Sequence, residues 1–310
     1  MYEISVGVGA CVRAGTRADV MWVVESDVPG GAAGALAFTA GGGRIGGLLG
    51  GALDDQAAGL VAGGTTGRLL DLEVDPLGAL VSDVPAGTRV RCLLAPAADF
   101  PEGFWDGLWA GRPVCLAATL DGDRIVSLRA YGEDEVAALG EEAARLFSRG
   151  ATASLVEADR VVTALWPVPR LALVGGGPVL DAVERAAQPL GWQVLRFPGA
   201  GEAAPVLLGL GGLDVVLVAS HDLGAAGSAL AAALSGNAGY VGALGSPRMH
   251  DARLDWLASR GVAGLERIHG PAGLDLGARR PAEVAVAILA EAMLVRSGRT
   301  GRPLRDVAPD

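Results

Sequence analysis

The three histidines of the chain all stand in its second half, each next to a loop that can carry polar chemistry. His221 and Asp222 directly follow an apolar run, and His269 opens a loop rich in glycine. His250 lies just inside an expected helix for which Ser246 is a suitable N-cap. A neutral imidazole can donate or accept a proton near pH 7, and a nearby carboxylate fixes its tautomer. Three histidines in such positions favour a polar site over three unrelated structural residues.

Acid–base chemistry at this site would need groups that move a proton and groups that hold a ligand. The expected catalytic residues are His221, Asp222, His269 and Asp275. Gly245, Ser246 and Arg248 are expected to bind the cofactor, because they open a helix and the guanidinium offers a fork for phosphate or carboxylate. An alternative stays open for His269 and Asp275, which could instead satisfy backbone groups of their own loop.

A glycine turn provides a second candidate feature. The sequence Leu-Ala-Leu-Val-Gly-Gly-Gly-Pro-Val-Leu at 171–180 predicts a buried strand, a tight turn and a helix over 178–190. The glycines bring free helix N–H groups close to the end of the sheet, where they form an anion cradle. The cofactor-binding residues expected at this turn are Gly175, Gly176, Gly177 and Pro178.

The turn departs from the dinucleotide-binding fingerprint GxGxxG in two respects. Leu180 stands where the third glycine belongs, and the strand expected at 192–196 ends in Arg-Phe-Pro, with no acid to hold a ribose hydroxyl. Arg196 is assigned to the cofactor site, where it would meet a 2′-phosphate or another anion, and a solvated surface arginine is the alternative. The cofactor is therefore NAD(P) or a different phosphate-bearing group.

Strand and helix patterns alternate from Arg170 onward, which predicts an α/β fold with a Rossmann-like, doubly wound parallel sheet. The expected strands are 171–174, 192–196, 214–219 and 239–243, and the expected last helix is 283–296. Residues that follow successive strands lie at one edge of such a sheet, so the site residues are predicted to converge there. This domain is assigned to 170–298, followed by a tail at 299–310.

The first half combines short strands, glycine turns and three helical stretches, which predicts an α+β domain over 1–166. The expected strands are 20–24, 35–39, 45–49, 69–81, 89–94, 114–120, 125–129, 153–157 and 161–165, and the expected helices are 51–60, 102–110 and 134–149. Trp166-Pro167-Val168-Pro169 interrupts both patterns and is expected to link the two domains.

Composition limits the classes of function. The chain has 310 residues and a formal net charge of -10, which argues against a nucleic-acid surface. Cys11, Cys92 and Cys115 lack disulfide or metal-binding spacing, and no metal site is expected. The N-terminus lacks the features of a signal peptide, and glycines and an acid interrupt the apolar stretches before any reaches a membrane span. We therefore expect a cytoplasmic homodimer that binds a small molecule, without nucleic-acid or membrane partners.

Several motifs of the second half occur together and in order: Gly-Gly-Gly-Pro-Val at 175–179, Ser-His-Asp at 220–222, Tyr-Val-Gly-Ala-Leu-Gly-Ser at 240–246, the loop at 268–279 and the helix at 281–291. In these motifs the chain resembles the XdhC/CoxI family, the accessory proteins for xanthine dehydrogenase and related molybdenum hydroxylases. The resemblance covers about 170–298 and implies a Rossmann-like C-terminal domain. It also implies binding of molybdenum cofactor (molybdopterin), support of its sulfuration, and delivery to an apo molybdenum hydroxylase.

The first half departs from that family at two cysteine motifs. Gly50-Gly51-Ala52-Leu53-Asp54 stands where the family typically has Gly-Gly-Cys-Val-Glu, and Val81-Ser82-Asp83-Val84-Pro85 stands in place of Gly-Cys-Gly-Gly. A thiolate is a soft nucleophile and metal ligand that alanine cannot replace. Three functions stay open: a divergent carrier of molybdenum cofactor or a nucleotide, an NAD(P)-dependent oxidoreductase of a specialised biosynthetic pathway, and a structural partner without a working cofactor site.

Overall fold

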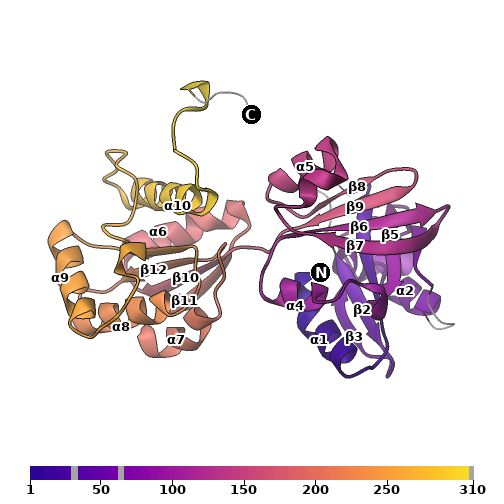
Figure 1. Cartoon of the computed structure of the whole chain (residues 1–310), viewed down its shortest axis with the longest axis horizontal. Coiled ribbons are helices and arrows are strands. Elements are labelled where there is room, and N and C mark those ends of the chain that lie inside the picture. Colours follow the sequence, from indigo (N-terminus) through magenta and orange to yellow (C-terminus); the bar gives the residue numbers. More distant parts are fainter. Residues whose placement is uncertain (29–33, 62–65, 307–310) are drawn as a thin grey trace. The chain divides into compact units, whose positions relative to one another are not determined.

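The computed structural model describes residues 1–28, 34–61 and 66–306. The chain divides into two compact units, Met1–Pro167 and Val168–Asp310, and the division falls inside the segment predicted as a linker. Each unit has its own sheet and its own hydrophobic core (Figure 1). Among the described helices, none is both long enough and apolar enough to cross a membrane.

Within its described residues, the first unit forms a nine-stranded antiparallel sheet with the strand order β3-β2-β1-β5-β4-β7-β6-β9-β8. The strands are β1 (Ala18–Ser26), β2 (Ala35–Thr39), β3 (Arg44–Gly47), β4 (Arg68–Glu73), β5 (Arg89–Pro96), β6 (Val114–Asp121), β7 (Arg124–Tyr131), β8 (Ala153–Val156) and β9 (Arg160–Leu165). The helices are α1 (Tyr2–Arg13), α2 (Asp54–Val61), α3 (Pro76–Leu80), α4 (Phe104–Trp109) and α5 (Glu141–Ser148). This mixture of an antiparallel sheet and helices confirms the predicted α+β class.

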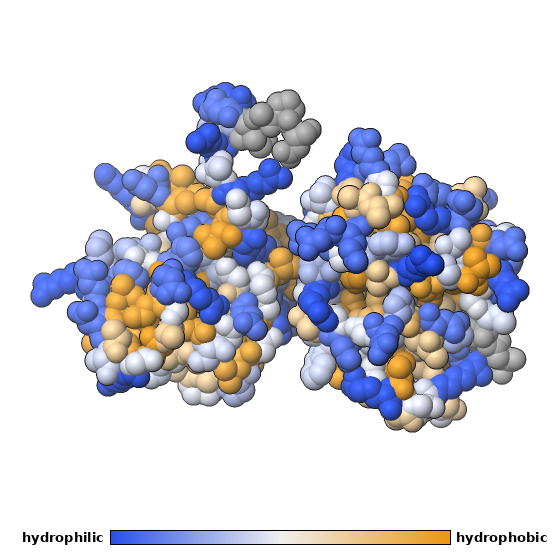
Figure 2. All heavy atoms as spheres, in the orientation of Figure 1, coloured by the Kyte–Doolittle hydropathy of each residue, from blue (hydrophilic) through white to orange (hydrophobic). Residues whose placement is uncertain are grey.

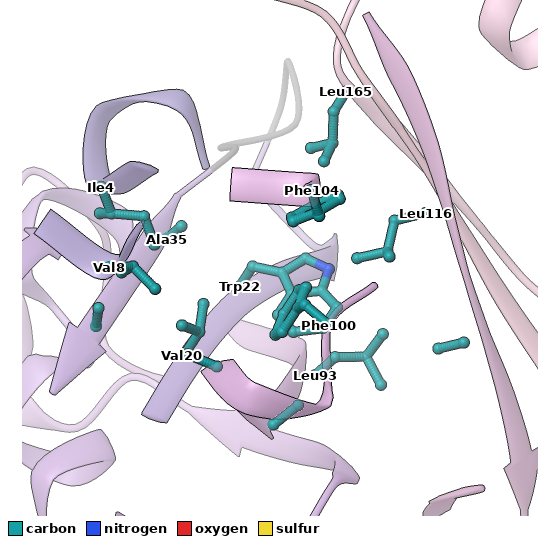
Figure 3. Packing of buried hydrophobic residues seen from close by; sticks show 14 of the residues in the cluster. Ile4, Val8, Val20, Trp22, Ala35, Leu93, Phe100, Phe104, Leu116 and Leu165 are labelled. Carbon is teal, nitrogen blue, oxygen red and sulfur yellow. The ribbon is translucent and has the colours of Figure 1, made fainter. Parts of the chain in front are cut away.

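The core of the first unit forms around Trp22, which is almost fully buried on β1. Its ring lies 5.5 Å from the ring of Phe100, and its indole N–H donates to the Thr163 hydroxyl on β9 at 3.3 Å. Figure 3 shows Leu93 and Leu116, from β5 and β6, beside these rings. β1 and β9 are far apart in the strand order, so the sheet must curl until these two strands contribute to one core.

Two predicted elements of the first unit are wrong in part. The strand expected at 69–81 ends early, because the Asp75 carboxylate accepts from the Gly78 N–H at 2.7 Å and so caps a helix. The helix expected at 134–149 is interrupted at Gly140, whose φ of +99° does not fit a helix. In both places local backbone chemistry overrides the apolar pattern.

The second unit is a doubly wound α/β domain, as predicted, and its described residues form five parallel strands in the order β11-β10-β12-β13-β14. The strands are β10 (Arg170–Gly175), β11 (Gln193–Phe197), β12 (Val215–Ala219), β13 (Tyr240–Ala243) and β14 (Ile268–His269). The main helices are α6 (Pro178–Ala187), α7 (Ala200–Leu208), α8 (Leu223–Leu234), α9 (Pro247–Ala258) and α10 (Pro281–Ser297). α6 and α10 cover one face of the sheet, and α7, α8 and α9 cover the other (Figure 1).

The direction of the strand order reverses at β10. The chain passes from β10 to β11 on one side and then, through α7, to β12 on the other side. The connections that leave the carboxyl ends of β10 and β12 therefore diverge, and open α/β sheets bind ligands at such a switch point. The glycine turn at 175–177 follows β10 at this point.

The last helix, α10, is apolar on more than its core-facing side. Ala285, Ile288 and Ala292 are buried, while Val286 and Met293 are exposed. Figure 2 shows apolar side chains at the surface over this helix. Apolar patches of this kind often mark contact surfaces. The homodimer stays a prediction, and this helix face is a place to test it.

Candidate functional site

The turn after β10 depends on two glycines whose backbone angles other residues avoid. Gly175 has a φ of +102°, and a Cβ atom there would collide with the carbonyl oxygen of Ala219 on β12. Gly177 has a φ of +119°, and a Cβ placed on it or on Gly176 would meet no atom within 4 Å. The turn thus fixes β10 against β12 on one side and leaves open space on the other.

Helix α6 begins after this turn at Pro178 with no side-chain cap, because its N-cap residue is Gly177. Two other helices that begin at this edge are capped by their own side chains: Asp222 accepts from the Ala225 N–H at 2.7 Å at the start of α8, and Ser246 caps α9 in the same way. The N–H groups in the first turn of α6 are therefore available to a ligand, and the helix dipole favours an anion there.

The connections after β12 and β13 carry other predicted site residues. His221 is exposed after β12, beside Asp222. The Asp222 carboxylate caps α8, and this hydrogen bond competes with the acid–base role predicted for Asp222. Gly245 and Arg248 are exposed after β13, on either side of the N-cap of α9. Because β10, β12 and β13 are neighbours in the sheet, the glycine turn and both connections share one edge.

His269 has a carboxylate neighbour, Glu291, that is not among the predicted site residues. Its ring stacks on Tyr240 with centroids 4.7 Å apart, and its Nδ1 lies 3.4 Å from the Glu291 carboxylate on α10. The other Glu291 oxygen accepts from the Tyr240 hydroxyl and the Gly273 N–H, both at 2.6 Å. Burial, followed by the hydrogen bond to Glu291, raises the pKa of Tyr240, so its hydroxyl stays protonated. Asp275 is exposed farther along the same loop.

Arg253, which is not predicted to belong to the site, and His250, which counts toward a polar site without a role of its own, lie beneath this edge. Arg253 is 2% exposed and donates to the carbonyl oxygens of Leu244 and Ser220, both at 2.8 Å. Burial lowers its pKa from the ordinary arginine value. The His250 ring lies against Gly270, where a Cβ atom would collide with its buried and unbonded Nδ1. Burial also lowers the pKa of His250, which favours the neutral imidazole.

Arg196 points toward α6 and forms two ion pairs there. Its guanidinium lies 2.6 Å from Asp181 and 2.7 Å from Glu184. The hydrogen bond to Asp181 is the main cause that raises the pKa of Arg196. Both carboxylates balance its charge, which argues against the predicted contact with a 2′-phosphate.

The two segments that replace the cysteine motifs are neighbours in the first unit. A Cβ on Gly50 would lie 3.8 Å from the Ser82 Cβ, and a Cβ on Gly78 would collide with the carbonyl oxygen of Ala52. Ala52 itself is buried. The fold therefore brings both segments together, and the position that corresponds to a family cysteine carries only a methyl group.

Two of the described cysteines, Cys92 and Cys115, are poor sources of a thiolate. Cys92 and Cys115 are buried, and burial raises their pKa values to about 12 and about 11. Cys11 is half-buried on α1. In the part of the chain that the structure describes, no three side chains of His, Cys, Asp or Glu are grouped as metal ligands.

A family comparison supports the assignment of the second unit. A family model described as the XdhC Rossmann domain matches residues 171–292. The matched range begins in β10 and ends within α10, so it contains the glycine turn, the connections after β12 and β13, and the Glu291 cluster. The whole candidate edge therefore lies inside the family domain.

Comparison with individual proteins gives more distant similarities. The uncharacterized protein YqeB of Escherichia coli is 28% identical over 155 residues, which cover 43% of this chain and 28% of that protein. A nicotinate-nucleotide--dimethylbenzimidazole phosphoribosyltransferase of Azotobacter vinelandii is 31% identical over 229 residues, which cover 67% of this chain and 59% of that protein. The chain thus spans less than two thirds of either relative. A solved structure described as a xanthine dehydrogenase from Bacillus halodurans is 16% identical, with a TM-score of 0.43 over 96% of both chains.

Proposed function

Residues 171–292 form an XdhC Rossmann domain, and on that premise we propose that the chain binds a phosphate-bearing cofactor at the carboxyl edge of its parallel sheet. The cofactor is molybdenum cofactor or a nucleotide, and the protein assists the maturation of a molybdenum hydroxylase. Its macromolecular partner is then the apo form of that hydroxylase. The proposal joins the family assignment to the geometry of one turn.

The observation that carries the proposal is the open, uncapped turn at 175–177. A phosphate group needs converging donors and room for its oxygens. The first turn of α6 supplies N–H groups, and no atom lies within 4 Å of a Cβ on Gly176 or Gly177. The helix dipole contributes up to ~1 kcal/mol to anion binding there. Arg248, exposed after β13, is the side-chain cation assigned to the same edge.

The same edge fits the adenosine part of NAD or NADP less well. No acid directly follows β11 to hold the free ribose hydroxyl of NAD. Arg196, which could meet the 2′-phosphate of NADP, is already paired with two carboxylates of α6. A ligand held mainly through its phosphate groups, such as the phosphate of a pterin cofactor, fits these residues better. This difference favours a carrier of molybdenum cofactor over an NAD(P)-dependent enzyme.

The state of the thiols favours a second candidate, an NAD(P)-dependent oxidoreductase of a specialised pathway. Sulfuration of a cofactor needs an accessible thiolate, whereas Cys92 and Cys115 are buried and Ala52 replaces the family cysteine. An oxidoreductase would use the glycine turn for a pyrophosphate and a histidine for proton transfer. His269, oriented beside Glu291, is the residue best placed for that second role.

Calorimetry on the full chain tests the proposal. Wild-type protein should bind NADH, NADPH or molybdopterin, and Gly177→Val should weaken that binding at least tenfold, on the order of 1.4 kcal/mol, because valine fills the open space and cannot adopt the native φ. Gly191→Val is the matched control, since Gly191 also has a positive φ and open surroundings but follows the far end of α6. Pterin released from the purified protein would identify a carrier, and nicotinamide would identify the oxidoreductase.

Two outcomes would count against the site. Equal binding by wild type and Gly177→Val would remove the glycine turn from it. A wild-type protein that binds none of the three probes, after release of any co-purified ligand, would refute the proposed cofactor binding as a whole.

A further inference from the structure

Arg253 is a buried cation for which the described residues provide no carboxylate partner. The residue is 2% exposed, and its hydrogen-bond partners are two backbone carbonyl oxygens. Burying a charge is costly unless other groups compensate for it. Two carbonyl groups compensate only in part. A buried arginine of this kind needs an explanation beyond packing.

The place of Arg253 in the sheet supplies that explanation. The pairing of β12 with β13 ends at Val218 and Ala243. One more backbone hydrogen bond follows, from the Leu244 N–H to the Val218 carbonyl oxygen. Beyond this point the two chains leave the sheet for α8 and α9. The Arg253 guanidinium spans the gap, because one nitrogen donates to Ser220 after β12 and the other to Leu244 after β13.

We propose that Arg253 is a positioning residue that ties the connection at 220–222 to the connection at 244–248 and places its charge beneath the anion site. This inference rests on the proposed function, because the tied connections border the edge at which the phosphate-bearing ligand binds. A Cβ on Gly245 would lie 3.3 Å from an Arg253 nitrogen, so the cation reaches directly under the turn that opens α9. The ligand class that this arrangement recognises is a phosphate or pyrophosphate group, whose negative charge compensates the buried cation.

Arg267 offers a matched control, because it performs a similar structural task elsewhere. Its guanidinium donates to the carbonyl oxygens of Leu234, Gly236 and Ala238, at 3.0 to 3.2 Å, and so ties the end of α8 to the segment that precedes β13. These carbonyls lie at the opposite end of β13 from the candidate site. Arg267→Ala removes hydrogen bonds to buried carbonyls as Arg253→Ala does, but it leaves the candidate edge intact.

The test measures amide hydrogen exchange of the full chain without ligand, followed by calorimetry with inorganic pyrophosphate. Arg253→Ala should increase exchange at least tenfold at both 220–225 and 244–249, while Arg267→Ala should leave these segments unchanged. Free guanidinium ion, at concentrations far below those that unfold the protein, should restore protection in Arg253→Ala. Arg253→Lys, which can reach one carbonyl at a time, should protect the two segments less than wild type does.

Pyrophosphate affinity should fall at least tenfold in Arg253→Ala and recover with guanidinium, and it should be unchanged in Arg267→Ala. Unchanged exchange at both segments in Arg253→Ala, or an increase spread evenly over the second unit, would overturn the positioning role. If wild type binds neither pyrophosphate nor any cofactor, the proposed function fails, whereas the exchange data still decide whether Arg253 ties the two connections.

Discussion

The Glu291 carboxylate allows a sharp test of how the loop after β14 is held. One of its oxygens accepts from both the Tyr240 hydroxyl and the Gly273 N–H at 2.6 Å, and the other faces His269 at 3.4 Å. A hydrogen bond to a charged group contributes about 1.5–3 kcal/mol. Glu291→Ala removes two such bonds and leaves two donors unpaired, so it should destabilise the second unit by about 3–6 kcal/mol. For a domain of this size the loss lowers the unfolding temperature by about 10 °C or more.

Glu291→Gln should behave differently, because both short hydrogen bonds end on one oxygen. The amide oxygen of glutamine has two lone pairs and can keep both donors. The substitution then loses only the charge assistance and changes the group that faces His269, at a cost of about 1–2 kcal/mol. Glu266→Ala, at an exposed position, should stay within about 0.5 kcal/mol of wild type.

Calorimetric unfolding and amide exchange of the Gly273 peptide provide the assay. Glu291→Ala should release protection over 270–276 before the rest of the second unit, and Glu291→Gln should retain most of it. Similar losses for alanine and glutamine would contradict the view that a single oxygen holds both donors. Wild-type stability in Glu291→Ala would show that the cluster does not hold the loop.

Three further outcomes follow from the structure. Gly175→Ala should destabilise the second unit by more than about 2 kcal/mol in denaturant unfolding, because of its positive φ and the collision with β12, whereas Gly176→Ala should have little effect on stability. Burial lowers the folded-state pKa of His250, so the unfolded state binds more protons below pH ~6.5 and wild-type stability falls as the pH drops through that range. His250→Asn should reduce this loss of stability, and a pH profile equal to that of wild type would contradict the role of His250. Cys92 and Cys115 should resist a thiol reagent at pH 8 until the protein is denatured, since burial raises both pKa values, and rapid native labelling would contradict this.

Much of the second unit can be predicted because its signals are local and repeated. Apolar runs that end in glycine or polar residues mark β10, β12 and β13 without reference to the rest of the chain. Ser246 and Pro247 predict the start of α9 from their own chemistry, and the structure confirms both positions. β14 could not be predicted from the sequence, because two residues are too few to show a periodic pattern. The first unit is harder, since one cap at Asp75 converts the end of an expected strand into a helix.

The candidate site could be located from the sequence, but not assembled. The predicted strand ends indicate where His221 and His269 lie along the edge. The sequence does not indicate that Glu291, 22 positions beyond His269, faces the His269 ring. Arg253 shows the same limit, because an arginine on a helix is usually exposed and burial is decided by the partner strands. Pairings between distant segments need the folded chain.

The proposed cofactor site and the two altered cysteine motifs lie in different units, so the proposed binding does not require those motifs. The anion cradle is made by backbone, through the φ of Gly175 and Gly177 and the free N–H groups of α6, and it does not depend on any side chain of the first unit. Sulfuration would depend on a thiolate, for which Ala52 has no substitute. If the proposed function holds, the altered cysteine motifs should abolish sulfur transfer without weakening ligand binding. Calorimetry with Ala52→Cys tests this, because the restored thiol should leave the affinity for the phosphate-bearing ligand unchanged, and a large change in that affinity would contradict the separation.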